Sequence, residues 1–480
     1  MKRNLIISIL FFFFLNACNS LDEPRLTENK SDFDDIFKHS TADFMNGDVV
    51  TETDVKKVAE KFASSELMGR KSTKNAQNYT ISKINDKRSE TNIYVVNYFN
   101  NDGFILISGT KNYVPILAYS PTGNYKDDCE KPEGVKIWEN ETAEALKRAN
   151  SLPSDSLKIF REMWYHYQSP EKIELNAKRQ PQKHLMEFDV EAAWANQLLA
   201  WYNTEGYEVF PITQAEITGN PTIDDRFRYS AQQSIYPPYE DDWEQYSAVV
   251  KRSISNISQK ANFIQTLWRQ NSPYNDSCPV LANGSHAAVG CGPLAVAQVM
   301  RYYQYPSSYN WSSMPHNYST PTTAQFLHEV GVQCNANYDT QTGIQLEDAK
   351  NTLLYYGYSA SIGNHNYSRT INNLNLNQPV IMSGELHKTD NTTSGHAWIA
   401  SGYNNSYFYY VYEVYTFNNR TTIDVVDTYD TNFIYSNYIY MVWGWGGSSD
   451  GYYHDNSLSI PSYATSISNR KNIYDIYPNY

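Results

Sequence analysis

A cysteine between two glycines, directly before a run of helix-forming residues, constrains this chain most. Pro293 follows Cys291 at a position that the first turn of a helix tolerates. The run from Leu294 to Tyr303 favours a helix that ends before the next proline. The sequence therefore predicts that Cys291 lies at the N-terminus of a helix.

This position makes Cys291 a candidate nucleophile. The unpaired backbone N–H groups and the positive end of the helix dipole stabilise a thiolate, which is the reactive form of cysteine. A buried structural cysteine is the alternative, and it is the commoner case for an arbitrary cysteine. The flanking glycines and the features described next favour the nucleophile.

A thiolate nucleophile needs a base that takes its proton and later protonates the leaving group. Near neutral pH, histidine suits this role. Among the ten histidines, His396 has the most suitable setting, because a glycine precedes it and residues 397–400 predict a buried strand. His286 and His454 are the rivals. His286 lies so close to Cys291 in sequence that the chain restricts its reach.

Two further segments complete a candidate catalytic site. Gln270 lies in a polar turn before Cys291, where its side-chain N–H could join the Cys291 backbone N–H in an oxyanion hole. Trp443 opens the motif Trp-Gly-Trp-Gly-Gly, whose rings could shield the histidine from water. Taken alone, the first is a simple polar turn and the second a glycine-rich turn with two packing tryptophans.

Taken in order, the glutamine turn, Gly-Cys-Gly, Gly-His-Ala and Trp-Gly-Trp-Gly-Gly resemble the streptopain family of papain-like cysteine peptidases. Residues 93–98, 103–109 and 115–120 also look like strands of that family's inhibitory prodomain. The resemblance implies an α+β fold, in which a small α+β prodomain precedes a papain-like catalytic domain, and hence a zymogen. It assigns four roles: nucleophile Cys291, base His396, oxyanion donor Gln270 and shielding Trp443.

Three departures from the family pattern matter. The family commonly has an asparagine before the first tryptophan, which orients the histidine, whereas this chain has Val442. We therefore expect a Cys/His dyad in which a backbone carbonyl or another polar side chain orients His396. The segment from Cys291 to His396 is shorter than the roughly 130–150 residues of papain-type enzymes, and the Tyr-rich run 407–440 predicts an added hairpin beside the active site. Residues 150–250 match no part of the family pattern.

The N-terminus has the composition of an export signal. Two basic residues precede an apolar run over residues 5–15, which is too short to span a bilayer. The run ends in Leu-Asn-Ala-Cys, which resembles a bacterial lipobox, so we expect Cys18 to carry lipid; an ordinary signal peptide is the alternative. Asp22 and Glu23 resemble the surface-export signal of some Gram-negative lipoproteins. These features predict a secreted protein in the cell envelope, lipid-anchored at the outer membrane or cell surface, or released after processing.

At 480 residues the chain is too long for one hydrophobic core. Apolar residues at helical spacing predict helices over 54–67 and 141–165. Lys251-Arg252 and Lys260 are candidate processing positions with an exposed composition, and we expect the mature enzyme to begin between about 240 and 260. The predicted parts are a lipoprotein signal peptide (1–17), a tether (18–50), the inhibitory prodomain (51–165), a linker region of unknown structure with processing sites (166–255) and the catalytic domain (256–480).

Composition limits the partners. The formal net charge of −13 repels phosphate backbones and argues against nucleic acid. Cys129, Cys278 and Cys334 leave the disulfide state open, and the cysteine and histidine spacings match no zinc site, so we expect no metal or other cofactor. The expected partners are protein or peptide substrates, the chain's own prodomain, and a membrane reached through the lipid.

The sequence thus predicts a cysteine endopeptidase that forms a thioester intermediate. A related Cys/His amidase would use the same residues, although a folded inhibitor is most useful against a protease that endangers the producing cell. A non-catalytic surface lipoprotein on a decayed peptidase fold is the third function. Val442 favours it, whereas the presence of the cysteine, the histidine and the glutamine argues against it.

Overall fold

The computed structural model describes most of the chain from residue 49 onward. Cys18, Asp22, Glu23 and Cys129 lie outside the described residues. Within the described part, no helix is long and apolar enough to cross a membrane. The described ranges are 49–63, 78–85, 92–126, 131–152, 207–212, 221–233, 245–387, 393–418, 423–430, 434–455 and 470–480, with a few single positions between 157 and 218.

The N-terminal unit packs helices on both faces of an antiparallel sheet. Along β2, Val95 points into a core shared with α3, whereas Val96 points into a core shared with α2. Because both faces are covered, β3 and β4 are buried throughout and read as continuous apolar runs. The elements are α2 (Glu52–Ala63), β1 (Tyr79–Asn85), β2 (Asn92–Tyr98), η3 (Phe99–Asn101), β3 (Phe104–Ser108), β4 (Ile116–Ser120) and α3 (Glu133–Ala149).

The predicted helix near residue 54 and the three predicted strands are confirmed by α2, β2, β3 and β4. The second predicted helix is displaced: α3 begins at Glu133 and ends at Ala149. Pro132 and Gly134 obscured this start, because glycine and proline usually indicate a break. Beyond α3, some of the described positions between 157 and 167 are again helical.

The C-terminal unit has a helical layer and a sheet layer. α7 contacts both α8 and α9, and its buried side chains form a core with the inner residues of the neighbouring strands. The sequence predicts one clear helix here, and the structure adds three. α10 is rich in asparagine, a weak helix former, so its pattern is faint. The helices are α7 (Cys291–Tyr303), α8 (Pro321–Gln333), α9 (Leu346–Tyr355) and α10 (Tyr367–Asn375), with a short η5 (Trp311–Ser313).

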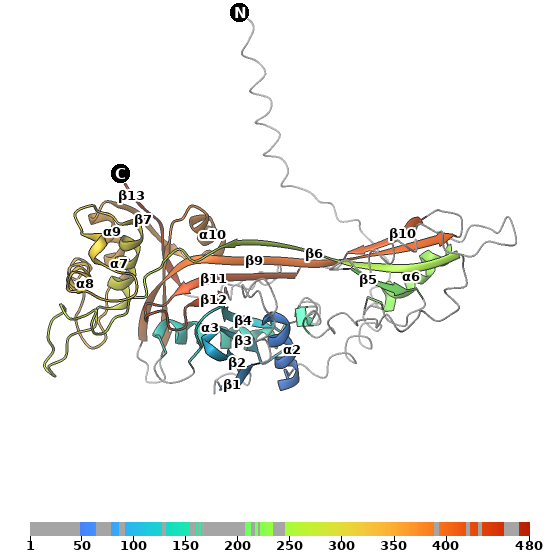
Figure 1. The fold of residues 1–480 in the computed structure, drawn as a ribbon, viewed down its shortest axis with the longest axis horizontal. Helices are drawn as coiled ribbons and strands as arrows, with labels where there is room; N and C mark the ends of the chain where they lie inside the picture. The colour runs from blue at the N-terminus through green and yellow to red at the C-terminus, as the bar shows by residue number, and fades with distance from the viewer. Residues whose placement is uncertain are drawn as a thin grey trace, which may run out of the picture.

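One continuous sheet joins the two units (Figure 1). Tyr119 and Ala118 of β4 pair with Tyr452 and Tyr453 of β12, so main-chain hydrogen bonds connect the N-terminal unit to the C-terminal unit. The strand order is β1-β2-β3-β4-β12-β11-β9-β8-β13-β7. The further bounds are β7 (Tyr358–Asn364), β8 (Val380–His387), β9 (Thr393–Asn418), β11 (Ile434–Val442), β12 (Gly451–His454) and β13 (Lys471–Pro478).

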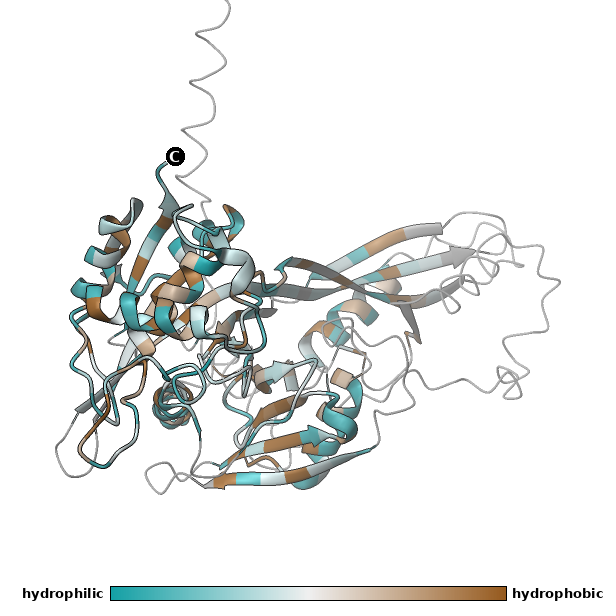
Figure 2. Cartoon of the chain, turned by 60° about the vertical axis from the view of Figure 1, so that its left-hand side comes forward, coloured by the Kyte–Doolittle hydropathy of each residue, from teal (hydrophilic) through white to brown (hydrophobic). Residues whose placement is uncertain are grey.

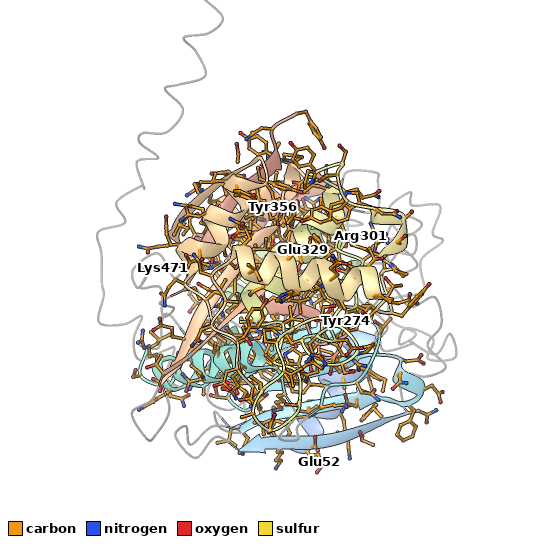
Figure 3. All side chains as sticks on the ribbon, turned by 90° about the vertical axis from the view of Figure 1, so that its left-hand side faces the viewer. Glu52, Tyr274, Arg301, Glu329, Tyr356 and Lys471 are labelled. Carbon is orange, nitrogen blue, oxygen red and sulfur yellow. The ribbon has the colours of Figure 1, made fainter. Side chains whose placement is uncertain are left out.

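The two units also share a hydrophobic core. Trp138 of α3 belongs to the same buried cluster as Trp398, Trp443 and Tyr453 of the C-terminal unit. Figure 2 shows hydrophobic residues repeated along the strands of the N-terminal unit, and Figure 3 shows that unit (Glu52) at the bottom of the view, below the helical layer (Glu329). The N-terminal unit is therefore built into the C-terminal unit through both its sheet and its core.

A long β-ribbon projects from the C-terminal unit (Figure 1). β6 (Gln245–Lys260) pairs with β9 along its whole length. At the far end, α6 (Pro221–Gln233) packs on this ribbon through Phe227, beside Val249 and Tyr412. The strands β5 (Tyr207–Pro211) and β10 (Ile423–Asp430) flank it. We call β5, α6, β10 and the adjoining parts of β6 and β9 the arm.

The arm corrects two expectations. The Tyr-rich run does form hairpins, but Figure 1 shows them extending away from α7 instead of beside it. The expected exposure of Lys251 is also wrong, since it is buried in β6 between β5 and β9. Its Nζ lies 4.3 Å from the ring centroid of Tyr410. A cation over an aromatic face can be buried in this way, and its charge in the sequence gives no sign of it.

Candidate active site

Cys291 is the first residue of α7, and Gly290 makes this start possible. Gly290 has φ 91°, a conformation that favours glycine, and its carbonyl accepts the Leu294 N–H at 3.0 Å. A side chain at position 290 would also come within 3.1 Å of Thr342. The half-buried Cys291 thiol therefore sits at the helix N-terminus, as the sequence predicts.

β9 brings His396 to this thiol. The backbone N–H of Ala397 lies 3.4 Å from Cys291 Sγ, and the ring of the preceding residue, His396, is close enough to lower the pKa of the thiol. His396 is buried, opposite Gly384 of β8. A thiol and an imidazole thus meet from segments far apart in the chain.

The pair shifts the pKa values of both groups. Burial raises the pKa of the Cys291 thiol, but the charge and hydrogen bond of His396, with two backbone N–H groups, outweigh burial and leave that pKa below its ordinary value. Burial lowers the pKa of His396, but Cys291, the Trp443 carbonyl and the Glu133 carboxylate together raise it above its ordinary value. This arrangement favours the thiolate–imidazolium pair.

A backbone carbonyl faces one ring nitrogen of His396. Nε2 lies 3.4 Å from the Trp443 oxygen. Val442 is buried and contributes to the core together with its strand neighbour Ile399. Of the two alternatives that the sequence leaves open for orienting His396, the geometry thus shows the backbone carbonyl.

Gln270 and Trp443 lie in the same region. The Gln270 carbonyl accepts the Val289 N–H at 3.0 Å, so its turn runs beside the residues that precede Cys291. The Trp443 ring is fully buried, and its indole N–H donates to the Ser449 carbonyl at 3.0 Å. The structure therefore brings together the four residues that the sequence selects, although their catalytic roles remain predictions.

The rival histidines lie elsewhere. His286 Nδ1 contacts the Cys278 carbonyl at 2.6 Å. His454 lies in β12, where its carbonyl accepts the Trp138 indole N–H. The other two described cysteines also differ from Cys291, because burial raises the pKa of Cys278 to about 11 and that of Cys334 to about 12. Among the described residues no group of three or more His, Cys, Asp or Glu could hold a metal.

The prodomain touches the site through the first turn of α3, a contact that the sequence does not reveal. A Cβ atom on Gly134 would lie 2.6 Å from both His396 Cδ2 and Trp443 Cε3. One helical turn on, Ile137 packs against Gly384. No sequence signal indicates this contact, because Gly134 beside Pro132 resembles a helix breaker.

Farther along the same face of α3, Glu141 forms an ion pair with Arg470, which is almost fully buried. The Arg470 guanidinium also lies 3.6 Å from Asp455 and 5.7 Å from the ring centroid of Trp398. The ring of Trp398 stacks with that of His396. α3 therefore covers a continuous strip from the histidine to Arg470.

A cysteine at a helix start, next to a histidine on a strand of an α+β fold, is the arrangement of a papain-like cysteine peptidase. The N-terminal unit that packs on this site corresponds to a prodomain. The peptidase C10 family model matches residues 268–308 and 307–453, and the Spi protease inhibitor model matches residues 47–146. The chain belongs to the streptopain family and carries the inhibitory prodomain of that family.

Individual relatives are distant. The chain is 25% identical to the thiol protease/hemagglutinin PrtT of Porphyromonas gingivalis, over 42% of this chain and 24% of that protein. It is 22% identical to streptopain of Streptococcus pyogenes, over 41% of this chain and 55% of that protein. The chain thus spans about a quarter and about half of their lengths. A fragment of Prevotella intermedia prointerpain A has a TM-score of 0.44 and 15% identity, over 84% of this chain and 100% of that one.

Proposed function

We propose that this protein is a secreted, lipid-anchored cysteine endopeptidase, made as a zymogen. The observation that carries the proposal is the Cys291 thiol at a helix N-terminus, 3.4 Å from the Ala397 N–H, with the neighbouring His396 lowering its pKa. A thiolate at neutral pH, beside a protonated imidazole, is the starting state for acyl transfer. The lipid anchor rests on Cys18 and the preceding signal-like sequence.

In the proposed reaction, the Cys291 thiolate attacks the carbonyl carbon of a peptide bond, and the carbonyl electrons move to oxygen. The Cys291 backbone N–H and the Gln270 side chain stabilise this oxyanion. His396 then donates its proton to the leaving amine as the C–N bond breaks. Water, deprotonated by His396, hydrolyses the thioester and regenerates the thiol.

Latency in this proposal comes from α3. Gly134 lies against the rings of His396 and Trp443, so the first turn of α3 occupies space next to the histidine. The Glu141–Arg470 pair and the β4–β12 pairing keep the helix there. Release of the prodomain would then open the site to a substrate of protein or peptide nature.

Expression of residues 19–480 tests the enzymatic part. Wild type, Cys291→Ala and Cys278→Ala are compared for self-processing, casein cleavage and labelling by a thiol-directed epoxide. We expect Cys291→Ala to lose all three, and Cys278→Ala to keep them because its thiol is buried and protonated. Inertness of the wild type in all three assays would favour a non-catalytic surface lipoprotein, and processing by Cys291→Ala would point to another nucleophile.

The anchor is tested separately in the full chain. Cys18→Ser should abolish incorporation of labelled fatty acid and move the protein from the envelope to the soluble fraction. Unchanged labelling of the Cys18→Ser chain would refute the lipid anchor without touching the peptidase proposal.

A further inference from the structure

The loop from Trp443 to Asp450 connects β11 to β12, and hydrogen bonds join its two ends. The Asp450 carboxylate oxygen Oδ1 accepts the Trp443 N–H at 2.9 Å. The Trp443 indole N–H donates to the Ser449 carbonyl, and the Tyr453 hydroxyl donates to the same carbonyl at 2.5 Å. The main chain and the ring of Trp443 are therefore both held by residues at the other end of the loop.

A buried carboxylate such as Asp450 is energetically unfavourable without an ion-pair partner. It is 8% exposed, and among the residues that the structure describes it forms no ion pair with a lysine, arginine or histidine. Burial raises its pKa to about 7, against the opposing effect of the Trp443 N–H. Near neutral pH a large share of Asp450 is therefore the neutral acid, whose carbonyl oxygen accepts a hydrogen bond as an amide oxygen does.

The hydrogen bonds lead from Asp450 to the catalytic pair. Asp450 accepts from the Trp443 N–H, and the Trp443 carbonyl faces His396 Nε2 at 3.4 Å. Since Val442 offers no side-chain acceptor, the direction of that carbonyl determines the orientation of the imidazole. A residue that fixes Trp443 therefore also fixes His396 relative to the Cys291 thiol.

We propose that Asp450 is a positioning residue for His396, acting through Trp443 in place of the side-chain partner that position 442 lacks. This inference rests on the proposed peptidase function. Asp450 does not touch the reacting atoms. Its contribution is to keep one backbone carbonyl in place.

The test compares Asp450→Ala, which removes the acceptor, with Asp450→Asn, which keeps one. The readouts are kcat and KM on a peptide substrate, and the pH dependence of Cys291 alkylation. Asp450→Ala should lower kcat about 10- to 100-fold with KM nearly unchanged, because a misplaced catalytic group loses rate and not binding. Its alkylation midpoint should move to higher pH, since a displaced imidazole stabilises the thiolate less. Asp450→Asn should restore both to near wild-type values.

A matched control is Asp224→Ala in the arm. Asp224 is also a buried carboxylate that accepts backbone N–H groups, from Ile217 and Thr218. Its replacement should reduce thermal stability and leave the alkylation profile unchanged. An equal shift of that profile in Asp224→Ala would reduce the role of Asp450 to general stability and overturn the proposal.

Two other results would also overturn it: Asp450→Asn as impaired as Asp450→Ala, or Asp450→Ala with wild-type kcat and alkylation profile. Should the alanine variant not fold, Asp450→Glu decides, because it keeps the carboxyl group but moves the acceptor by one methylene. Wild-type behaviour of Asp450→Glu would then count against positioning. The pH dependence of alkylation measures how strongly His396 stabilises the Cys291 thiolate, and it needs no peptide hydrolysis. A failure of this inference can therefore be distinguished from a failure of the proposed peptidase function.

Discussion

Replacing Gly134 by alanine should weaken the contact between the prodomain and the active site. The new Cβ atom would lie 2.6 Å from His396 Cδ2 and 2.6 Å from Trp443 Cε3. Both rings are buried, so neither can swing into solvent. The first turn of α3 has to move, or the rings have to shift against a packed core.

Overpacking of this kind costs about 1–3 kcal/mol. The upper part of that range, about 2–3 kcal/mol, applies here because the Cβ atom meets two buried rings at 2.6 Å. The better helix propensity of alanine offsets about 0.5–1 kcal/mol of this cost. The net effect is therefore about 1–2.5 kcal/mol in favour of the open zymogen. Since about 1.4 kcal/mol corresponds to a factor of ten in an equilibrium constant, the open population should rise about 5- to 60-fold.

The assay is the initial rate of epoxide labelling of Cys291 in the full chain, before processing begins, together with the half-time of self-processing. Gly134→Ala should label and process faster by the same factor. Gly343→Ala is the control, because Gly343 is exposed and a Cβ atom there meets nothing within 4 Å. After prodomain removal, Gly134→Ala should have wild-type activity. A labelling rate equal to or below that of wild type would refute the claim that this turn restrains the site.

Four further outcomes are expected. In His396→Ala, alkylation of Cys291 should have its midpoint at or above the ordinary thiol pKa of about 8.5, since burial still raises the pKa and the opposing charge is gone; an unchanged pH profile would exclude the ion pair. Gln270→Ala should lower kcat about 100-fold with little change in KM, and steady-state kinetics would show whether KM moves instead. Glu141→Gln removes one partner of a buried ion pair, a change that costs about 3–5 kcal/mol; Asp455 offsets part of this loss at Arg470. The variant should therefore release its prodomain at lower urea concentration, and an unchanged midpoint would contradict the pair's role. The processed enzyme should retain β6, because that strand pairs with β9 along its whole length; intact mass would reveal any loss, and Lys251→Ala should leave the fragment pattern unchanged.

Much of the candidate site was predictable because its signals are local. The start of α7 follows from the glycines around Cys291 and from Pro293, since sterics and unpaired N–H groups act within one helical turn. The strand around His396 follows from its apolar run. The sequence also shows that Val442 offers His396 no side-chain partner. It leaves open whether a backbone carbonyl or another polar side chain takes that place.

The contacts of α3 were not predictable in this way. Gly134 looks like a helix breaker in the sequence, whereas in the fold it is the residue small enough to lie against His396. Lys251 looks like an exposed processing position, whereas β5 and β9 bury it. In both cases a partner on β9 lies more than a hundred residues away, so a local pattern in the sequence cannot indicate the contact.

The sequence by itself determined the α+β class, the helix that begins at Cys291, the strand that carries His396 and the departure at Val442. Each depends on side-chain periodicity or on steric limits within a few residues. Only the tertiary structure decided that β4 pairs with β12, that Glu141 meets Arg470, that the Tyr-rich strands form an arm, and that Asp450 fixes Trp443. These features come from burial and hydrogen bonding between segments that the chain brings together only when it folds.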